Sequence, residues 1–305
     1  MRSVRVILFV AIATLCGGPA RAVGQCTLYG SDAADQFRNL WLLDPATGAG
    51  QVIGDLGAEI TGIAFHPFTG VLFGVTATIQ LPPDNFAPGD LVTIDPLTGV
   101  ATLVGSLGLD DLTDEGPTLA DIAFDPTTGV LYGWRARRSG DLYTVDLATG
   151  AATLVGQSGL SNTNGQGLTF GPGGNLYYAG EGTQGLLRTI DKSTGLPTGS
   201  IQLMNYPGDE NIPALDFDGR MIFGVAGTGG DLITINPATG EITTIGPIAS
   251  GPDVPDNTID GIAFACPRTS AGVPTMSAVG LACVAAALLA LGAYAAAAGA
   301  RRQAS

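Results

Sequence analysis

The side chains best suited to chemistry in this sequence are acids, gathered in polar stretches between apolar runs. Asp121 and Asp260 each stand directly at the start of an apolar run, and a second set lies inside the polar stretches. That set comprises Asp110, Asp111, Asp114, Glu115 and Asp256. Calcium prefers carboxylate and other oxygen ligands, about six to eight of them, and glycoside hydrolysis needs only two acids several ångströms apart. The acids therefore point to two chemistries, calcium binding and hydrolysis.

Other reactive groups are scarce. His66 is the only histidine, so neither Ser-His catalysis nor a multi-histidine metal site has the groups it needs. No G-x-S-x-G elbow and no phosphate-cradling loop occurs. Trp134 and Arg135 open the one basic cluster, WRARR at 134–138. They could clamp a carboxylate or stack on a sugar, or they could simply belong to a solvated loop.

One nine-residue phrase recurs five times and ends each time in D-P-x-T-G or a close variant. The copies stand at 40–48, 91–99, 142–150, 187–195 and 232–240. Asp caps such a turn, Pro presets φ at the next position, and Gly accepts a positive φ. One carboxylate per copy is too few for calcium. We therefore interpret the phrase as a hairpin turn.

A second phrase precedes the first in every unit but the first one, as in GIAFHPFTGVLFGV at 62–75 and DIAFDPTTGVLYGW at 121–134. Each unit then consists of four short strands rich in Val, Ile, Leu and Thr. The units repeat every 45 or 51 residues, which is the period of propeller blades. Small residues recur where blades would converge on the axis, at Ala64, Ala123 and Ala263. The repeats predict an all-β fold, a five-bladed β-propeller.

The chain begins and ends inside a repeat. Residues 26–30 match a second strand and residues 259–266 supply a lone first strand, so together they predict a fifth blade closed by pairing of the N- and C-terminal segments. Cys26 and Cys266 fall on the two ends of the turn that this blade lacks, near enough for a disulfide. We expect that bond in an oxidising exported environment; the alternative is two free thiols.

In a propeller, the loops between blades and those between second and third strands open on one face. Binding residues concentrate on loops that a rigid scaffold presents. We therefore expect a ligand-binding face carrying Asp110, Asp111, Asp121, Trp134, Arg135, Asp256 and Asp260. Asp121 and Asp260 would lie at the rim of the central channel, near Thr61 and Gln166. They could hold a calcium ion or a water cluster, or they could cap the strand entrance by accepting hydrogen bonds from loop amides.

The N-terminal sequence and the charge indicate export. Basic residues, an apolar run and small residues follow one another up to Ala22, which is the pattern of a secretory signal peptide over residues 1–22. All 27 Asp and Glu lie after it, against eight Lys and Arg in residues 23–268, a formal charge of about −19 for that part. Such an acidic surface repels phosphate backbones and argues against a nucleic-acid partner.

The C-terminal sequence indicates a membrane anchor. Residues 277–299 carry no charge and are followed by Arg301 and Arg302, which favours a transmembrane helix over a buried one. With VPTMS at 273–277, the segment resembles the IPTL-type sorting domains of bacterial surface proteins, although AVG at 278–280 departs from that pattern. The resemblance implies processing by a membrane sorting enzyme. The predicted parts are a signal peptide at 1–22, a propeller domain at 23–268, a linker and sorting motif at 269–276, and a transmembrane helix with a basic tail at 277–305.

The repeats across residues 26–266 look like those of bacterial extracellular propeller domains of the YVTN and NHL-like class. Such propellers serve adhesion, scaffolding, ligand binding and occasionally catalysis. We predict a surface-displayed or membrane-anchored, non-enzymatic binding or structural module, released if its C-terminal segment is cleaved. Its ligand would be an unknown extracellular glycan or protein, and calcium is the only cofactor we consider. The alternative is an extracellular carboxylate-dependent hydrolase such as a glycosidase.

Overall fold

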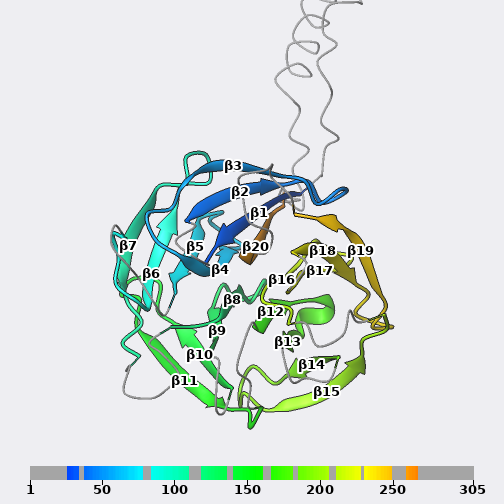
Figure 1. Ribbon diagram of the computed structural model, residues 1–305. Coiled ribbons are helices and arrows are strands. Elements are labelled where there is room, and N and C mark those ends of the chain that lie inside the picture. Colours follow the sequence, from blue (N-terminus) through cyan, green and yellow to red (C-terminus); the bar gives the residue numbers. More distant parts are fainter. Residues whose placement is uncertain are drawn as a thin grey trace, which may run out of the picture. The chain divides into compact units, whose positions relative to one another are not determined.

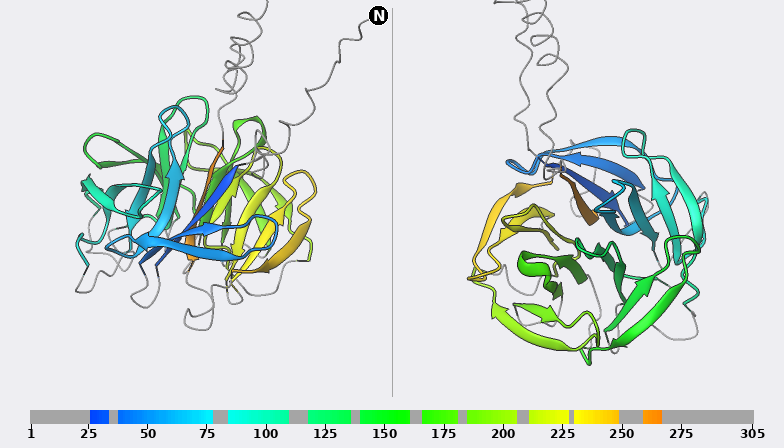
Figure 2. Two further views of the ribbon diagram at one scale, coloured as in Figure 1. Left: turned by 90° about the horizontal axis from the view of Figure 1, so that it is seen from above. Right: turned by 180° about the vertical axis from the view of Figure 1, so that it is seen from behind.

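The protein is a five-bladed β-propeller. The computed structural model describes residues 26–33, 38–77, 84–109, 118–135, 140–160, 166–180, 185–205, 211–227, 230–248 and 259–266. In these residues twenty strands form five four-stranded antiparallel sheets, which stand around a common axis as blades (Figures 1 and 2). The predicted all-β, five-bladed architecture is confirmed.

The blades follow one another along the chain, and each runs from its innermost to its outermost strand. Blade 1 consists of β4 (Ile60–Phe65), β5 (Leu72–Thr76), β6 (Asp90–Ile94) and β7 (Ala101–Ser106). Blade 2 consists of β8 (Asp121–Phe124), β9 (Leu131–Arg135), β10 (Asp141–Val145) and β11 (Ala152–Gln157). Blade 3 consists of β12 (Gln166–Phe170), β13 (Leu176–Gly180), β14 (Leu186–Ile190) and β15 (Pro197–Gln202), with a 3-10 turn at Pro172–Gly174. Blade 4 consists of β16 (Leu215–Phe217), β17 (Ile222–Ala226), β18 (Asp231–Ile235) and β19 (Ile242–Pro247).

Blade 5 joins the two ends of the propeller. Its strand order is β20 (Ile259–Ala265), β1 (Thr27–Asp32), β2 (Asn39–Leu43) and β3 (Gly50–Asp55). Phe264 pairs with Leu28 as Phe65 pairs with Leu72 in blade 1, so the closed blade keeps the register of an intact one. Cys26 and Cys266 form a disulfide with their Cα atoms 4.1 Å apart. Both the predicted closure and the predicted disulfide are confirmed.

Burial follows the position of each strand in its blade. All five residues of β5 are buried, whereas β7 has no buried residue and exposes three of its six. Inner strands are covered on both sides by neighbouring blades, and the five apolar clusters of the protein lie between blades rather than within them. The continuous apolar runs of the sequence, such as LVTI, therefore reflect two buried faces.

A glycine near the end of the outermost strand lets each blade meet the next. A Cβ on Gly105 would collide with the carbonyl oxygen of Thr149, in the D-L-A-T-G turn of blade 2. The same contact recurs at three other boundaries: Gly54 meets Thr98, Gly156 meets Thr194, and Gly246 meets Thr47. The boundary between blades 3 and 4 differs, because Met204 there forms a parallel bridge with Glu241. At these four boundaries, the Thr-Gly turn of one repeat therefore packs against the outer-strand glycine of the preceding repeat.

No helix among the described residues is long and apolar enough to cross a membrane. The expected signal peptide at 1–22, the linker at 269–276 and the expected span at 277–305 lie outside the described residues.

Candidate functional site

One position of the innermost strand lies against the neighbouring blade all around the ring. Its occupants in blades 1 to 5 are Gly62, Asp121, Gly167, Ala214 and Gly261. A Cβ on Gly62 would come within 2.8 Å of the Cα of Asp121, and one on Gly167 within 2.9 Å of the carbonyl carbon of Ala214. The inner strands approach too closely for larger side chains, and Asp121 is the exception.

Asp121 lies inside the ring rather than at its rim. It is 1% exposed. Its Oδ1 accepts a hydrogen bond from its neighbour Ile122 N–H at 2.8 Å, and its Oδ2 accepts from Leu168 N–H of blade 3 at 2.8 Å and Leu215 N–H of blade 4 at 3.4 Å. Burial raises the pKa of Asp121 well above its ordinary value, although the three amides act in the opposite direction. Of the two roles expected for Asp121, these hydrogen bonds fit the acceptance of backbone amides, although the amides belong to strands of three blades and not to loops.

A second central carboxylate, Asp216 of β16, was missed by the sequence analysis. Its Oδ2 accepts from Phe264 N–H of blade 5 at 2.6 Å, and its Oδ1 accepts from Phe217 N–H at 2.8 Å and from the Thr169 hydroxyl at 3.4 Å. Burial raises the pKa of Asp216 to about 6 against these hydrogen bonds. Alignment of the repeats could have identified Asp216, because it takes the place that alanine holds in three other repeats.

Asp260 is the remaining acid near the inner strands, and it belongs to β20. It is partly buried, and no hydrogen bond of its carboxylate is present. Burial, together with the like charges of Asp32 and Glu59, raises the pKa of Asp260 to about 7. Thr61, expected close by, donates its hydroxyl to the Leu119 carbonyl at 2.9 Å. Asp260 is thus the one central acid whose oxygens are not held by amides.

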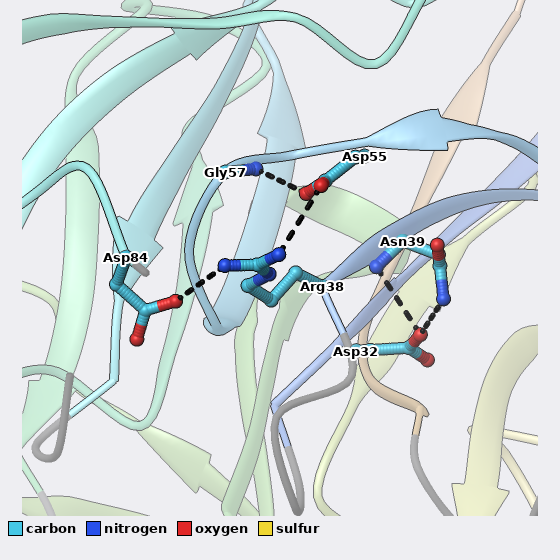
Figure 3. A network of polar contacts seen from close by, with 6 residues as sticks. All are labelled: Asp32, Arg38, Asn39, Asp55, Gly57 and Asp84. Atoms are coloured by element: carbon cyan, nitrogen blue, oxygen red, sulfur yellow. Dashed lines mark hydrogen bonds and ion pairs between the residues drawn. The ribbon is translucent and has the colours of Figure 1, made fainter. Parts of the chain in front are cut away.

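A network of polar contacts lies where β1 ends and β2 begins in blade 5 (Figure 3). Asp32 is fully buried and accepts from the backbone and side-chain amides of Asn39 at 3.2 and 3.0 Å. Arg38 bridges Asp55 of β3 at 3.3 Å and Asp84 of blade 1 at 3.1 Å. The guanidinium therefore ties the closing blade to the next one.

The two described residues of the basic cluster, Trp134 and Arg135, do not lie in an exposed loop. Trp134 lies in β9, not in a loop, and is fully buried, with its ring centroid 4.3 Å from that of Tyr178 in blade 3. Arg135, the last residue of β9, is 6% exposed. Neither ring face of a buried, stacked tryptophan is open to a sugar, so that placement is corrected. Asp110, Asp111, Asp114, Glu115 and Asp256 lie outside the described residues.

The repeated D-P-x-T-G phrases are turns, as predicted. In the first copy, Asp44 accepts from Ala46 N–H at 2.9 Å and from the Thr47 hydroxyl at 2.8 Å, and Gly48 has φ +80°. These hydrogen bonds lower the pKa of Asp44. His66 serves a related turn, where its Nδ1 accepts from Phe68 N–H at 3.0 Å. The only imidazole of the chain is therefore occupied by its own turn.

Neither described cavity contains a central acid. One of about 390 Å³ lies beside Cys26 and Asp44, and another of about 620 Å³ lies between the two turns of blade 1, flanked by Val71 and Val100. Within the described part of the chain, no group of three or more His, Cys, Asp or Glu side chains is arranged to hold a metal ion.

The first of two similar solved structures supports the fold. A chain of the crystal structure of a nidogen/laminin complex matches with a TM-score of 0.51 and 13% identity, covering 79% of this chain and 98% of that chain. The crystal structure of Myxococcus xanthus glutaminyl cyclase matches with a TM-score of 0.44 and 18% identity, covering 64% of this chain and 72% of that chain. No curated protein matches the sequence.

The family comparison covers more than half of the chain. The model of DUF6923, described as a repeat of unknown function, matches residues 110–273. This range takes in blades 2, 3 and 4 and the strand that closes blade 5. The chain therefore belongs to the DUF6923 repeat family.

Proposed function

We propose that the protein is an exported, surface-displayed module that binds an extracellular glycan or protein and does not catalyse a reaction. The observation that carries this proposal is the state of the two central carboxylates. Both oxygens of Asp121 and both of Asp216 accept hydrogen bonds, mainly from strand amides of several blades. Groups held in this way stabilise the ring, because they satisfy amides at the inner edges of the sheets.

The rival function is carboxylate-dependent hydrolysis, and Asp260 is the acid that favours it. A general acid needs a raised pKa, and the pKa of Asp260 is raised to about 7. Its partner would have to be Asp32 or Glu59, the two acids that act on its charge. Asp32 is already bound by Asn39 and by the Trp41 indole, which weakens it as a nucleophile or base.

One experiment separates the two functions. The full-length chain and its Asp260→Asn variant are tested for binding to a glycan array and a panel of extracellular matrix and envelope proteins, and for turnover of chromogenic glycosides. Saturable binding that survives Asp260→Asn, without turnover, is the expected result. If the wild type hydrolyses a glycoside and Asp260→Asn does not, the protein is a hydrolase and the proposed binding function is wrong.

Export and anchoring are part of the same proposal. The Cys26–Cys266 disulfide supports an oxidising location, and the composition of residues 277–305 supports a membrane anchor that a sorting enzyme processes. We expect the full chain in the membrane fraction of its host, and a chain that ends at residue 268 in the medium. If the two chains divide equally between membrane and medium, residues 269–305 do not act as a membrane anchor.

Calcium stays a prediction for Asp121 and Asp260. The oxygens of Asp121 already accept hydrogen bonds from amides. Asp260, together with the nearby Asp32 and Glu59, would therefore supply most of the negative charge for the ion. A calcium ion would need further oxygens from carbonyl groups or water.

A further inference from the structure

Buried polar atoms without a partner are confined to one boundary between blades. In the described part of the chain they are the indole Nε1 of Trp134, the amide Oε1 and Nε2 of Gln166, and the Nε of Arg188. Buried polar groups are nearly always hydrogen-bonded, so each exception calls for an explanation. Four such atoms on three residues are unusual in one place.

The topology brings these three residues to the facing sides of blades 2 and 3. Trp134 packs with Leu168 and Tyr178 of blade 3. Gln166 stands two residues before Leu168 in unbroken register, so its side chain leaves the same face of β12. Arg188 is the cross-strand partner of Tyr178 and shares that face as well.

The same chain shows how a satisfied boundary looks. Trp41, on the side of blade 5 that packs against blade 4, is buried like Trp134 and donates its indole N–H to Asp32 at 2.8 Å. Arg38 has two carboxylate partners. Among the described residues, Arg188 has no carboxylate partner.

The unsatisfied atoms indicate which polar groups a ligand would need in order to pair with them. An indole N–H, an amide NH₂ and a guanidinium N–H are donors, one of them charged, and the amide oxygen of Gln166 is the single acceptor. A carboxylate would satisfy the charged donor, and a hydroxyl beside it would satisfy the acceptor. A sugar acid carries both groups at a spacing of a few bonds.

We propose that the boundary between blades 2 and 3 is a binding site for a carboxylate-bearing sugar, held by Arg188, Gln166 and the indole N–H of Trp134. The inference rests on the proposed binding function and names its ligand class. Trp134 and Tyr178, both fully buried, are stacked at this boundary, so the proposed binding requires the two rings to part. The ligand would then select the conformation in which they have parted.

The test uses the full-length chain with D-glucuronate, D-glucose and acetate as probes, followed by calorimetry, thermal melting and tryptophan fluorescence. Glucuronate should bind saturably, raise the melting temperature and change the fluorescence as the Trp134–Tyr178 stack opens. Glucose, which lacks the carboxylate, should bind at least about tenfold more weakly. Arg188→Met should abolish the preference for glucuronate, and Arg220→Met, at an exposed arginine of blade 4, should leave it unchanged.

Gln166→Leu keeps the test decisive if Arg188→Met does not fold. It removes an unsatisfied amide, so it should raise the melting temperature of the free protein and reduce the shift that glucuronate gives. Equal responses to glucuronate, glucose and acetate would overturn the proposal, as would equal effects of the two arginine variants. If glucuronate fails while an array glycan or a protein binds, only this site is wrong. If nothing binds at all, the proposed function is wrong.

Discussion

The contact between T-G turns and outer-strand glycines makes Gly105→Ala an informative perturbation. Gly105 has an ordinary strand conformation, so the only obstacle to alanine is the Thr149 carbonyl of blade 2, which a Cβ would overlap. The turn must move by about an ångström, and overpacking of this kind costs about 1–3 kcal/mol. The smaller entropy of the unfolded alanine chain returns about 0.4–1 kcal/mol. We expect a net loss of about 1–2 kcal/mol, which is about 2–8 °C in melting temperature for a domain of this size.

Gly199→Ala is the matched control. Gly199 lies in β15, an outermost strand like β7, and a Cβ there would meet nothing within 4 Å. This variant should match or slightly exceed the wild type in a thermal melt followed by circular dichroism. The reasoning fails if Gly105→Ala melts within about 1 °C of Gly199→Ala, since the blades would then slide apart at negligible cost.

Three further outcomes are expected. The free energy of unfolding should increase by about 2–4 kcal/mol as the pH falls from 8 to 5. Asp216 and Asp260 have pKa values of about 6 and 7 in the folded protein, above the unfolded value of 3.8. In this pH range the folded protein therefore binds more protons than the unfolded chain, and protonation favours the fold. Chemical denaturation across that range measures it, and Asp260→Asn should flatten the profile; an unchanged profile in that variant would contradict the assignment. Cys26→Ser should lower stability by about 2–5 kcal/mol, and thiol titration of the native wild type should find no reaction at Cys26 or Cys266. Millimolar calcium should raise the melting temperature more than magnesium, with Asp121→Asn plus Asp260→Asn removing the gain; equal effects of calcium, magnesium and sodium chloride at matched ionic strength would show charge screening instead.

The sequence predicted what depends on the repeat and missed what depends on contacts between repeats. The length of the repeat and the points where the chain enters and leaves it are enough to place Cys26 beside Cys266, because the two residues stand at the two ends of the turn that blade 5 lacks. Asp121 was aligned correctly, yet alignment could not tell that its carboxylate reaches amides of blades 3 and 4. Trp134 was placed in a loop because the Arg-rich run after it masks the end of β9. The glycines that meet neighbouring turns recur in the sequence, but only the packing of blades explains them.

The closing disulfide also determines how the ring carries mechanical load. Tension that arrives along the chain from beyond Cys266 can pass through the sulfur atoms to Cys26, across a sequence separation of 240, without following the chain between them. At that point the load divides between β20 and β1, which are hydrogen-bonded to each other along six residue pairs. Neither strand can be peeled from the other end first, because the bond joins them at the point where the force enters. Blade 5 therefore receives the load through two hydrogen-bonded strands rather than through one.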